Sequence, residues 1–229
     1  EPLNLKLNSI KNKRILVIEE EGTTGLTGDL DIRSEGSDHV NFWHNVGHSE
    51  TGKLSSNNKS GSAGQGNIIY FGSSQIFSAF IYTNRMNAKT HQEYIMGKCE
   101  LPHTWTDKTN KKKAYSFEGF WAKITKKNEV RPIDDSTEID KFKNAFKLER
   151  DFTETGLSLI IPFVNEDINE EGLLKATLKE YFYAILLGDL EIEIYGETLN
   201  RNTVMDIAEK HAPETREYRD FLCETETIS

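Results

Sequence analysis

The stretch ILVIEEEGTTGLTG, residues 15–28, decides the fold that this chain is expected to adopt. It begins with four apolar residues, three of them β-branched, and such a short continuous run predicts a strand buried on both faces. Three glutamates and a glycine-rich run follow at once. The carboxyl end of the strand therefore leads acidic residues and glycines into a loop, and layered α/β proteins tend to build their ligand sites at such ends.

A second glycine-rich loop, SGSAGQGN, occupies residues 60–67. Glycines permit positive φ and let backbone amides approach a ligand closely. A glycine-rich run before a helix offers amide donors to phosphates, whereas an acid at a strand end can accept a hydrogen bond from an exocyclic amine such as that of adenine. Residues 50–63, which lead into the second loop and include its first residues, are expected to be a mobile lid that nucleotide orders. A solvated turn for the first loop and a flexible linker for the second are the alternative interpretations.

Several function classes fit the sequence poorly. The second loop lacks the Gly-Lys-Ser/Thr of a P-loop, and neither loop has the G-x-G-x-x-G pattern of dinucleotide-binding folds. A formal net charge of -9 disfavours a nucleic-acid-binding subunit, because phosphate contacts need Lys and Arg. No apolar run approaches the roughly 18 residues that cross a bilayer. His39, His44 and His48 lack the spacing of a zinc site.

The order of these segments resembles the ATP site of the GHKL superfamily, the clamp-type ATPases of gyrases, mismatch-repair proteins, heat-shock chaperones and histidine kinases. There, a buried strand ends in Asp-x-Gly-x-Gly, whose Asp holds the adenine amine; a lid, a Gly-x-x-Gly-x-Gly motif and later a Gly-Thr-x strand follow. Here Glu20-Glu21-Gly22 stands where the first motif begins, and residues 61–66 have the spacing of the second. Thr155-Gly156-Leu157-Ser158 looks like a variant of the third. The first loop is closer still to bacterial GHKL ATPase subunits of DNA-linked repair and phage-defence systems.

The resemblance implies an α+β fold, a two-layer sandwich of a mixed β-sheet with helices on one face, known as the histidine-kinase-like ATPase fold. It implies an ATP-binding domain at residues 1–165 and the start of a transducer or linker region at residues 166–229. It also implies ATP and Mg²⁺ as cofactors, a cytoplasmic location, other subunits or a second copy as partners, nucleic acid only as an indirect partner, and no membrane. The cofactor-binding residues that it implies, with no metal ligand among them, are Glu20, Gly22, Thr24, Gly25, Gly61, Gly64, Gln65, Gly66, Asn67 and Ser158.

The sequence departs from the family pattern at three points. Glu20 replaces the Asp, and one extra methylene moves the carboxylate by about 1.5 Å, so water would have to mediate the adenine contact or the contact would have to be re-formed. Asn67 stands where the closer set has Lys. The family's helix with a Glu base and a Mg-binding Asn has no counterpart before residue 15, so no catalytic residue is assigned.

These departures leave two functions in competition. One is ATP binding in a nucleotide-gated clamp, which would hydrolyse ATP only if an upstream segment supplied the base. The other is a non-enzymatic interaction module on the same fold that has lost nucleotide binding. Ser158 has its own alternative, a strand residue whose hydroxyl is hydrogen-bonded to the backbone.

The remaining elements are expected from periodicity. A helix is predicted over residues 169–187, stopped by Gly188, because apolar residues recur there at helical spacing: Leu174, Leu178, Tyr181, Phe182 and Ile185. Strands are predicted near residues 77–82, 115–124, 157–163 and 190–195. Pro162 is expected to end the third of these strands or to place it at a sheet edge.

Overall fold

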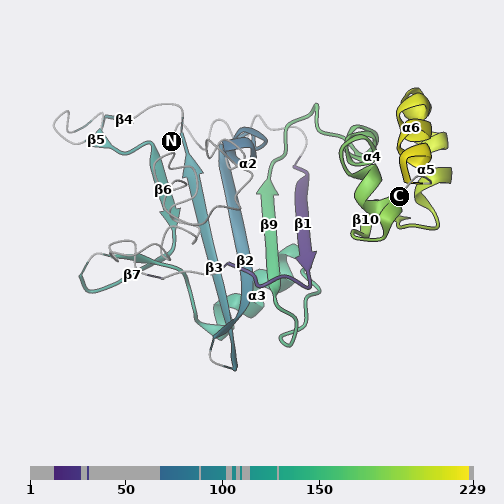
Figure 1. Cartoon of the computed structure of the whole chain (residues 1–229). Coiled ribbons are helices and arrows are strands. Elements are labelled where there is room, and N and C mark those ends of the chain that lie inside the picture. The colour runs from purple at the N-terminus through teal and green to yellow at the C-terminus, as the bar shows by residue number, and fades with distance from the viewer. Residues whose placement is uncertain are drawn as a thin grey trace. The chain divides into compact units, whose positions relative to one another are not determined.

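The computed structural model describes residues 13–26, 30, 68–87, 89–101, 105–106, 109, 114–127 and 129–226 (Figure 1). The predicted lid and the second glycine-rich loop lie outside these residues. The chain divides into two compact units, Glu1–Asn165 and Glu166–Ser229. The sequence places its domain boundary between the same two residues.

The first unit is built on a five-stranded sheet in the order β1-β9-β2-β3-β6 (Figure 1). Its strands are β1 (Ile15–Glu21), β9 (Gly156–Pro162), β2 (Ser78–Asn87), β3 (Thr90–Glu100) and β6 (Glu118–Trp121). The expected α+β class is confirmed, but the expectation of a mixed sheet is wrong for the described strands, because each neighbouring pair is antiparallel. A short turn joins β2 to β3, and only antiparallel strands can be joined that way.

Two short strand pairs lie outside this sheet. The strand β4 (Trp105–Thr106) pairs with β5 (Ala114–Tyr115), and β7 (Lys123–Ile124) pairs with β8 (Val130–Arg131). The strand predicted at 115–124 is thus divided among β5, β6 and β7.

Two expectations about individual strands are corrected by their places in the sheet. The strand β1 lies at the edge and is not buried on both faces: Ile15 and Ile18 are each 48% exposed. The strand β9 lies between β1 and β2, so Pro162 ends an interior strand and does not mark an edge. Pro162 is tolerated there because it is the last residue of the strand.

The helix α3 (Ser136–Phe146) covers one face of the sheet, called here the α3 face (Figure 1). The side chain of Asp135 caps its start by accepting a hydrogen bond from the amide of Glu138. The buried residues of this core are Tyr82, Ile95, Ile139, Phe142, Leu148 and Ile160.

The opposite face of the sheet is called here the α2 face, because the short helix α2 (Ile68–Gly72) contacts it through Phe71. The buried Phe71 lies beneath the ammonium group of Lys98, 5.6 Å from the ring centroid. Lys98 in β3 is paired with Ala79 in β2. Both lie an odd number of positions along their strands from residues of the α3 face, so their side chains point to the opposite face. Among the described residues, α3 is the helix that packs on a face of the sheet, which is consistent with the expected two-layer fold, and α2 adds the contact of Phe71 with Lys98 on the other face.

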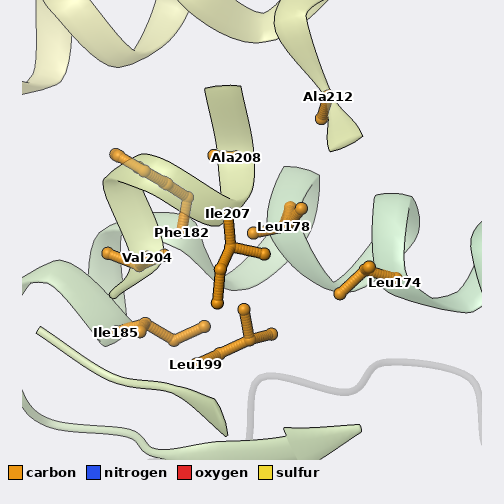
Figure 2. Packing of buried hydrophobic residues seen from close by; sticks show 9 residues of the cluster. All are labelled: Leu174, Leu178, Phe182, Ile185, Leu199, Val204, Ile207, Ala208 and Ala212. Atoms are coloured by element: carbon orange, nitrogen blue, oxygen red, sulfur yellow. The ribbon is translucent and has the colours of Figure 1, made fainter. Parts of the chain in front are cut away.

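The second unit is helical with one β-hairpin. It contains α4 (Glu170–Leu187), β10 (Ile192–Ile194), β11 (Glu197–Leu199), α5 (Val204–His211), the 3-10 turn η5 (Pro213–Thr215) and α6 (Arg216–Glu226). The predicted helix α4 is confirmed: the Asn169 side chain caps its first turn, and Gly188 ends it with φ of 84°. Figure 2 shows how side chains of α4, β11 and α5 point toward one another to form its core.

Candidate functional site

The carboxyl end of β1 lies directly against the beginning of β9. In the antiparallel register Glu19 faces Ser158, Glu20 faces Leu157 and Glu21 faces Gly156. The first loop and the segment that resembles the third GHKL motif, far apart in the sequence, are thus neighbours in the sheet.

Threonine hydroxyls hold the first loop onto β9 and β2. Thr155 donates its hydroxyl to the carbonyl of Thr23 at 2.6 Å. The hydroxyl of Thr83, in β2, donates to the carbonyl of Gly156 at 3.1 Å and accepts from the amide of Leu26 at 2.9 Å. These hydrogen bonds join the first loop, β9 and β2 at one end of the sheet.

Two glycines let the first loop turn at this end of the sheet. Gly22 and Gly25 have φ of 70° and 67°, in the left-handed region that favours glycine. A Cβ at Gly25 would also lie 2.6 Å from the carbonyl oxygen of Asn84, whereas one at Gly22 would meet nothing within 4 Å. Gly25 is thus required for close approach to β2. Thr24, the other predicted site residue here, is exposed, and its hydroxyl donates to the carbonyl of Gly25 at 3.3 Å.

Strand alternation divides the site residues between the two faces. Glu20 points to the α2 face in a row with Leu157 and Thr83, which pair across the sheet. Its carboxylate accepts a hydrogen bond from the hydroxyl of Thr23 at 3.1 Å, and the side chain is exposed. Ile18, two residues earlier, exposes apolar surface on the same face. An exposed carboxylate beside an apolar side chain suits a flat ring that carries an amine.

A buried arginine lies next to this row. Arg85 in β2 is 9% exposed and shares the α2 face with Thr83, two residues away. Its guanidinium donates to the carbonyl of Leu26 at 3.4 Å and lies 5.1 Å from the centre of the Tyr94 ring. It adds positive charge behind the first loop.

The structure does not bring Ser158 to the side of the sheet on which Glu20 lies. Ser158 is fully buried on the α3 face and donates to the carboxylate of Glu19 at 2.7 Å. Because neighbouring positions along a strand point to opposite faces, Glu20 and Ser158 cannot line one pocket. Leu157 and Thr83 share the face of Glu20 in place of Ser158, and Thr155 contacts the first loop.

A polar network underlies the site on the α3 face. Tyr82 donates its hydroxyl to the carboxylate of Glu93 at 2.6 Å, and the ammonium group of Lys143 lies 3.6 Å from the same carboxylate. Burial, together with the hydrogen bond to Glu93, raises the pKa of Tyr82 well above its usual value. The tyrosine therefore stays protonated and serves as a donor that joins the sheet to α3.

The second glycine-rich loop, with Gly61, Gly64, Gln65, Gly66 and Asn67, lies outside the described residues. Within the described ranges, no group of three or more His, Cys, Asp or Glu side chains is arranged to hold a metal ion. None of the helices in that part of the chain is both long and apolar enough to span a bilayer.

Comparison with family models, with curated proteins and with solved structures gave no match for this chain. The geometry of the candidate site is therefore the only basis on which its chemistry can be interpreted. Reasoning from the sequence missed two residues of it, Thr83 and Arg85. Neither had a motif around it, although the alternation of β2 could have placed Thr83 and Arg85 on one face.

Proposed function

We propose that the first unit binds ATP at the carboxyl end of β1, on the α2 face, with the histidine-kinase-like ATPase fold that its sequence resembles. The observation that carries this proposal is the pairing of β1 with β9, which joins the first loop to Thr155-Gly156-Leu157. A GHKL-type site needs these two segments in one base pocket. The same resemblance suggests a nucleotide-gated clamp in a DNA-linked repair or defence system.

Four side chains of the described residues contribute to this site. The Glu20 carboxylate accepts a hydrogen bond from the exocyclic amine of adenine, directly or through a water molecule. Ile18 offers an apolar surface to the ring. The hydroxyls of Thr83 and Thr155 hold the first loop in place. The phosphates and Mg²⁺ would lie toward the second glycine-rich loop, whose amides suit anions.

Calorimetry with ATP and Mg²⁺ tests the proposal, with inosine triphosphate as the comparison because an oxygen replaces its exocyclic amine. We expect Glu20→Ala to weaken ATP binding at least about tenfold, since hydrogen bonds to charged groups contribute about 1.5–3 kcal/mol. Binding of inosine triphosphate should change much less. Glu21→Ala is the matched control, because this exposed carboxylate points to the other face. A folded wild-type chain that releases no heat with ATP would favour the interaction module instead.

We further expect this chain to bind ATP without appreciable turnover. A general base must lie within about 3 Å of the attacking water, beyond the terminal phosphate. In the proposed site the glutamates of β1 lie at the base end of the nucleotide and cannot reach that water. Steady-state phosphate release should stay at the level of a no-enzyme blank. Glu50, an acid of the predicted lid, is the other carboxylate to test. Turnover that disappears in Glu19→Ala or Glu50→Ala would contradict this assignment of roles.

A further inference from the structure

Arg150 is a buried arginine at the place where β1 and β9 meet. It lies in the segment between α3 and β9 and is 3% exposed. Its Nη2 atom donates to the carbonyl oxygen of Glu20 at 2.6 Å and to that of Leu157 at 3.2 Å. Its Nη1 atom donates to the carbonyl oxygen of Thr155 at 3.4 Å. One guanidinium therefore contacts the backbone of both segments that form the candidate site.

The identity of Gly156 is linked to this arrangement. A Cβ at Gly156 would lie 2.3 Å from Nη1 of Arg150 and 2.2 Å from the carbonyl oxygen of Glu20. Any larger residue would have to displace the guanidinium or the backbone of β1. The glycine thus leaves the space that the arginine fills.

Other polar groups hold Arg150 in place from the α3 face. The Lys143 ammonium group, on α3, donates to the carbonyl oxygen of Arg150 at 2.9 Å. Nη2 of Arg150 lies 3.5 Å from the hydroxyl of Ser158, which in turn donates to the carboxylate of Glu19. A guanidinium stays charged at every physiological pH and presents its donors in a rigid plane, so this contact has a defined direction.

Burying such a charge is costly, and a well-packed apolar side chain often stabilises a core as well or better. The position of Arg150 is therefore better explained by what it orients than by stability alone. It contacts the peptide of Glu20 from the α3 face, while the Glu20 side chain points to the α2 face. A rotation of that peptide would turn the carboxylate away from its ligand.

We propose that Arg150 is the positioning residue of the nucleotide site: it fixes the backbone of Glu20 and thereby the direction of the carboxylate that reads the base. This inference rests on the proposed ATP-binding function. Arg150 itself touches no ligand. Its contribution is to base recognition, so it acts on the preference for ATP over inosine triphosphate.

The test measures the ratio of the two nucleotide affinities in the wild type and in variants. We expect Arg150→Met to lower the preference for ATP about tenfold, because the loss of a charge-assisted contact frees the Glu20 peptide. Arg150→Lys, which keeps the charge but reaches fewer carbonyls, should give an intermediate ratio. Partial unfolding would lower both affinities alike and leave the ratio unchanged, so a merely structural role does not move this measurement.

Arg219→Met is the matched control. Arg219 is equally buried, at 2%, but lies in the second unit, where it donates to Glu209 at 2.9 Å. Its loss should leave the ratio at the wild-type value.

Three outcomes decide between the proposals. A wild-type chain that prefers ATP, with an Arg150→Met variant that keeps the full preference, overturns the role of Arg150 alone. A folded wild-type chain that binds neither nucleotide overturns the ATP site and the role of Arg150 together. If Arg150→Met does not fold, Arg150→Lys decides: an unchanged ratio overturns the inference and a reduced one supports it.

Discussion

Gly25→Ala is expected to destabilise the first unit by about 4 kcal/mol, and Gly22→Ala by only about 1 kcal/mol. Both glycines have nearly the same positive φ, so both variants incur the same backbone strain. Only at Gly25 would the added methyl group overlap the carbonyl oxygen of Asn84 and the hydroxyl of Thr83, at 2.6 and 2.7 Å. The difference between the two variants in the free energy of unfolding therefore measures the effect of the close packing of the first loop against β2.

Urea unfolding followed by tryptophan fluorescence measures this difference. The chain has three tryptophans, Trp43, Trp105 and Trp121, and all belong to the first unit, so the signal reports on that unit alone. Equal midpoints for the two variants would show that the first loop does not pack against β2 as described. Gly25→Ala should also lose ATP binding in conditions where the unit is still folded, because the added methyl group displaces the first loop beside Glu20.

Phe182→Ala is expected to cost the second unit about 4 kcal/mol, the usual range for removing a buried aromatic ring. Phe182 is 1% exposed and lies among Leu178, Val204 and Ile207 in the core of that unit (Figure 2). Domains this small are marginally stable, at roughly 0.05–0.15 kcal/mol per residue. The loss should therefore leave the unit largely unfolded.

The neighbouring residue provides the control. Tyr181 is 52% exposed, so Tyr181→Ala should change stability by less than about 0.5 kcal/mol. Amide hydrogen exchange distinguishes the two variants: α4 and α5 should lose protection in Phe182→Ala and keep it in Tyr181→Ala. Protection that survives in Phe182→Ala would mean that this core does not hold the second unit together.

Local signals in the sequence were sufficient for several elements. The helix α4 was predicted within one residue of its bounds, because its capping residue, its apolar spacing and its terminal glycine all lie within the helix or next to it. The apolar runs of β1 and β9 were likewise recognised as strands. The helix α3 carries comparable signals, an Asp135 cap with Ile139, Phe142 and Phe146 on one side, although no helix is among the elements predicted there.

Other elements have no recognisable secondary-structure pattern in their own sequence. The strand β3 reads THQEYIMGKCE, in which polar and apolar residues do not alternate, yet it forms a ten-residue-pair ladder with β2. Its centre is buried on both faces, with Tyr94 and Met96 on the α2 face and Ile95 on the face where α3 packs. Burial on both faces removes the period of two by which a strand is recognised.

The sequence by itself determined the kinds of residue at the candidate site: an acid at a strand end, glycines that permit a tight loop, and a later Thr-Gly segment. Only the tertiary structure decided which of them share a face. Glu20 and Ser158 are separated onto opposite faces, and Arg150 is joined to the peptide of Glu20 from 130 positions away in the sequence. A helix is specified by residues three or four apart, whereas the register between two distant strands is set by the packing of the whole sheet, which no local pattern encodes.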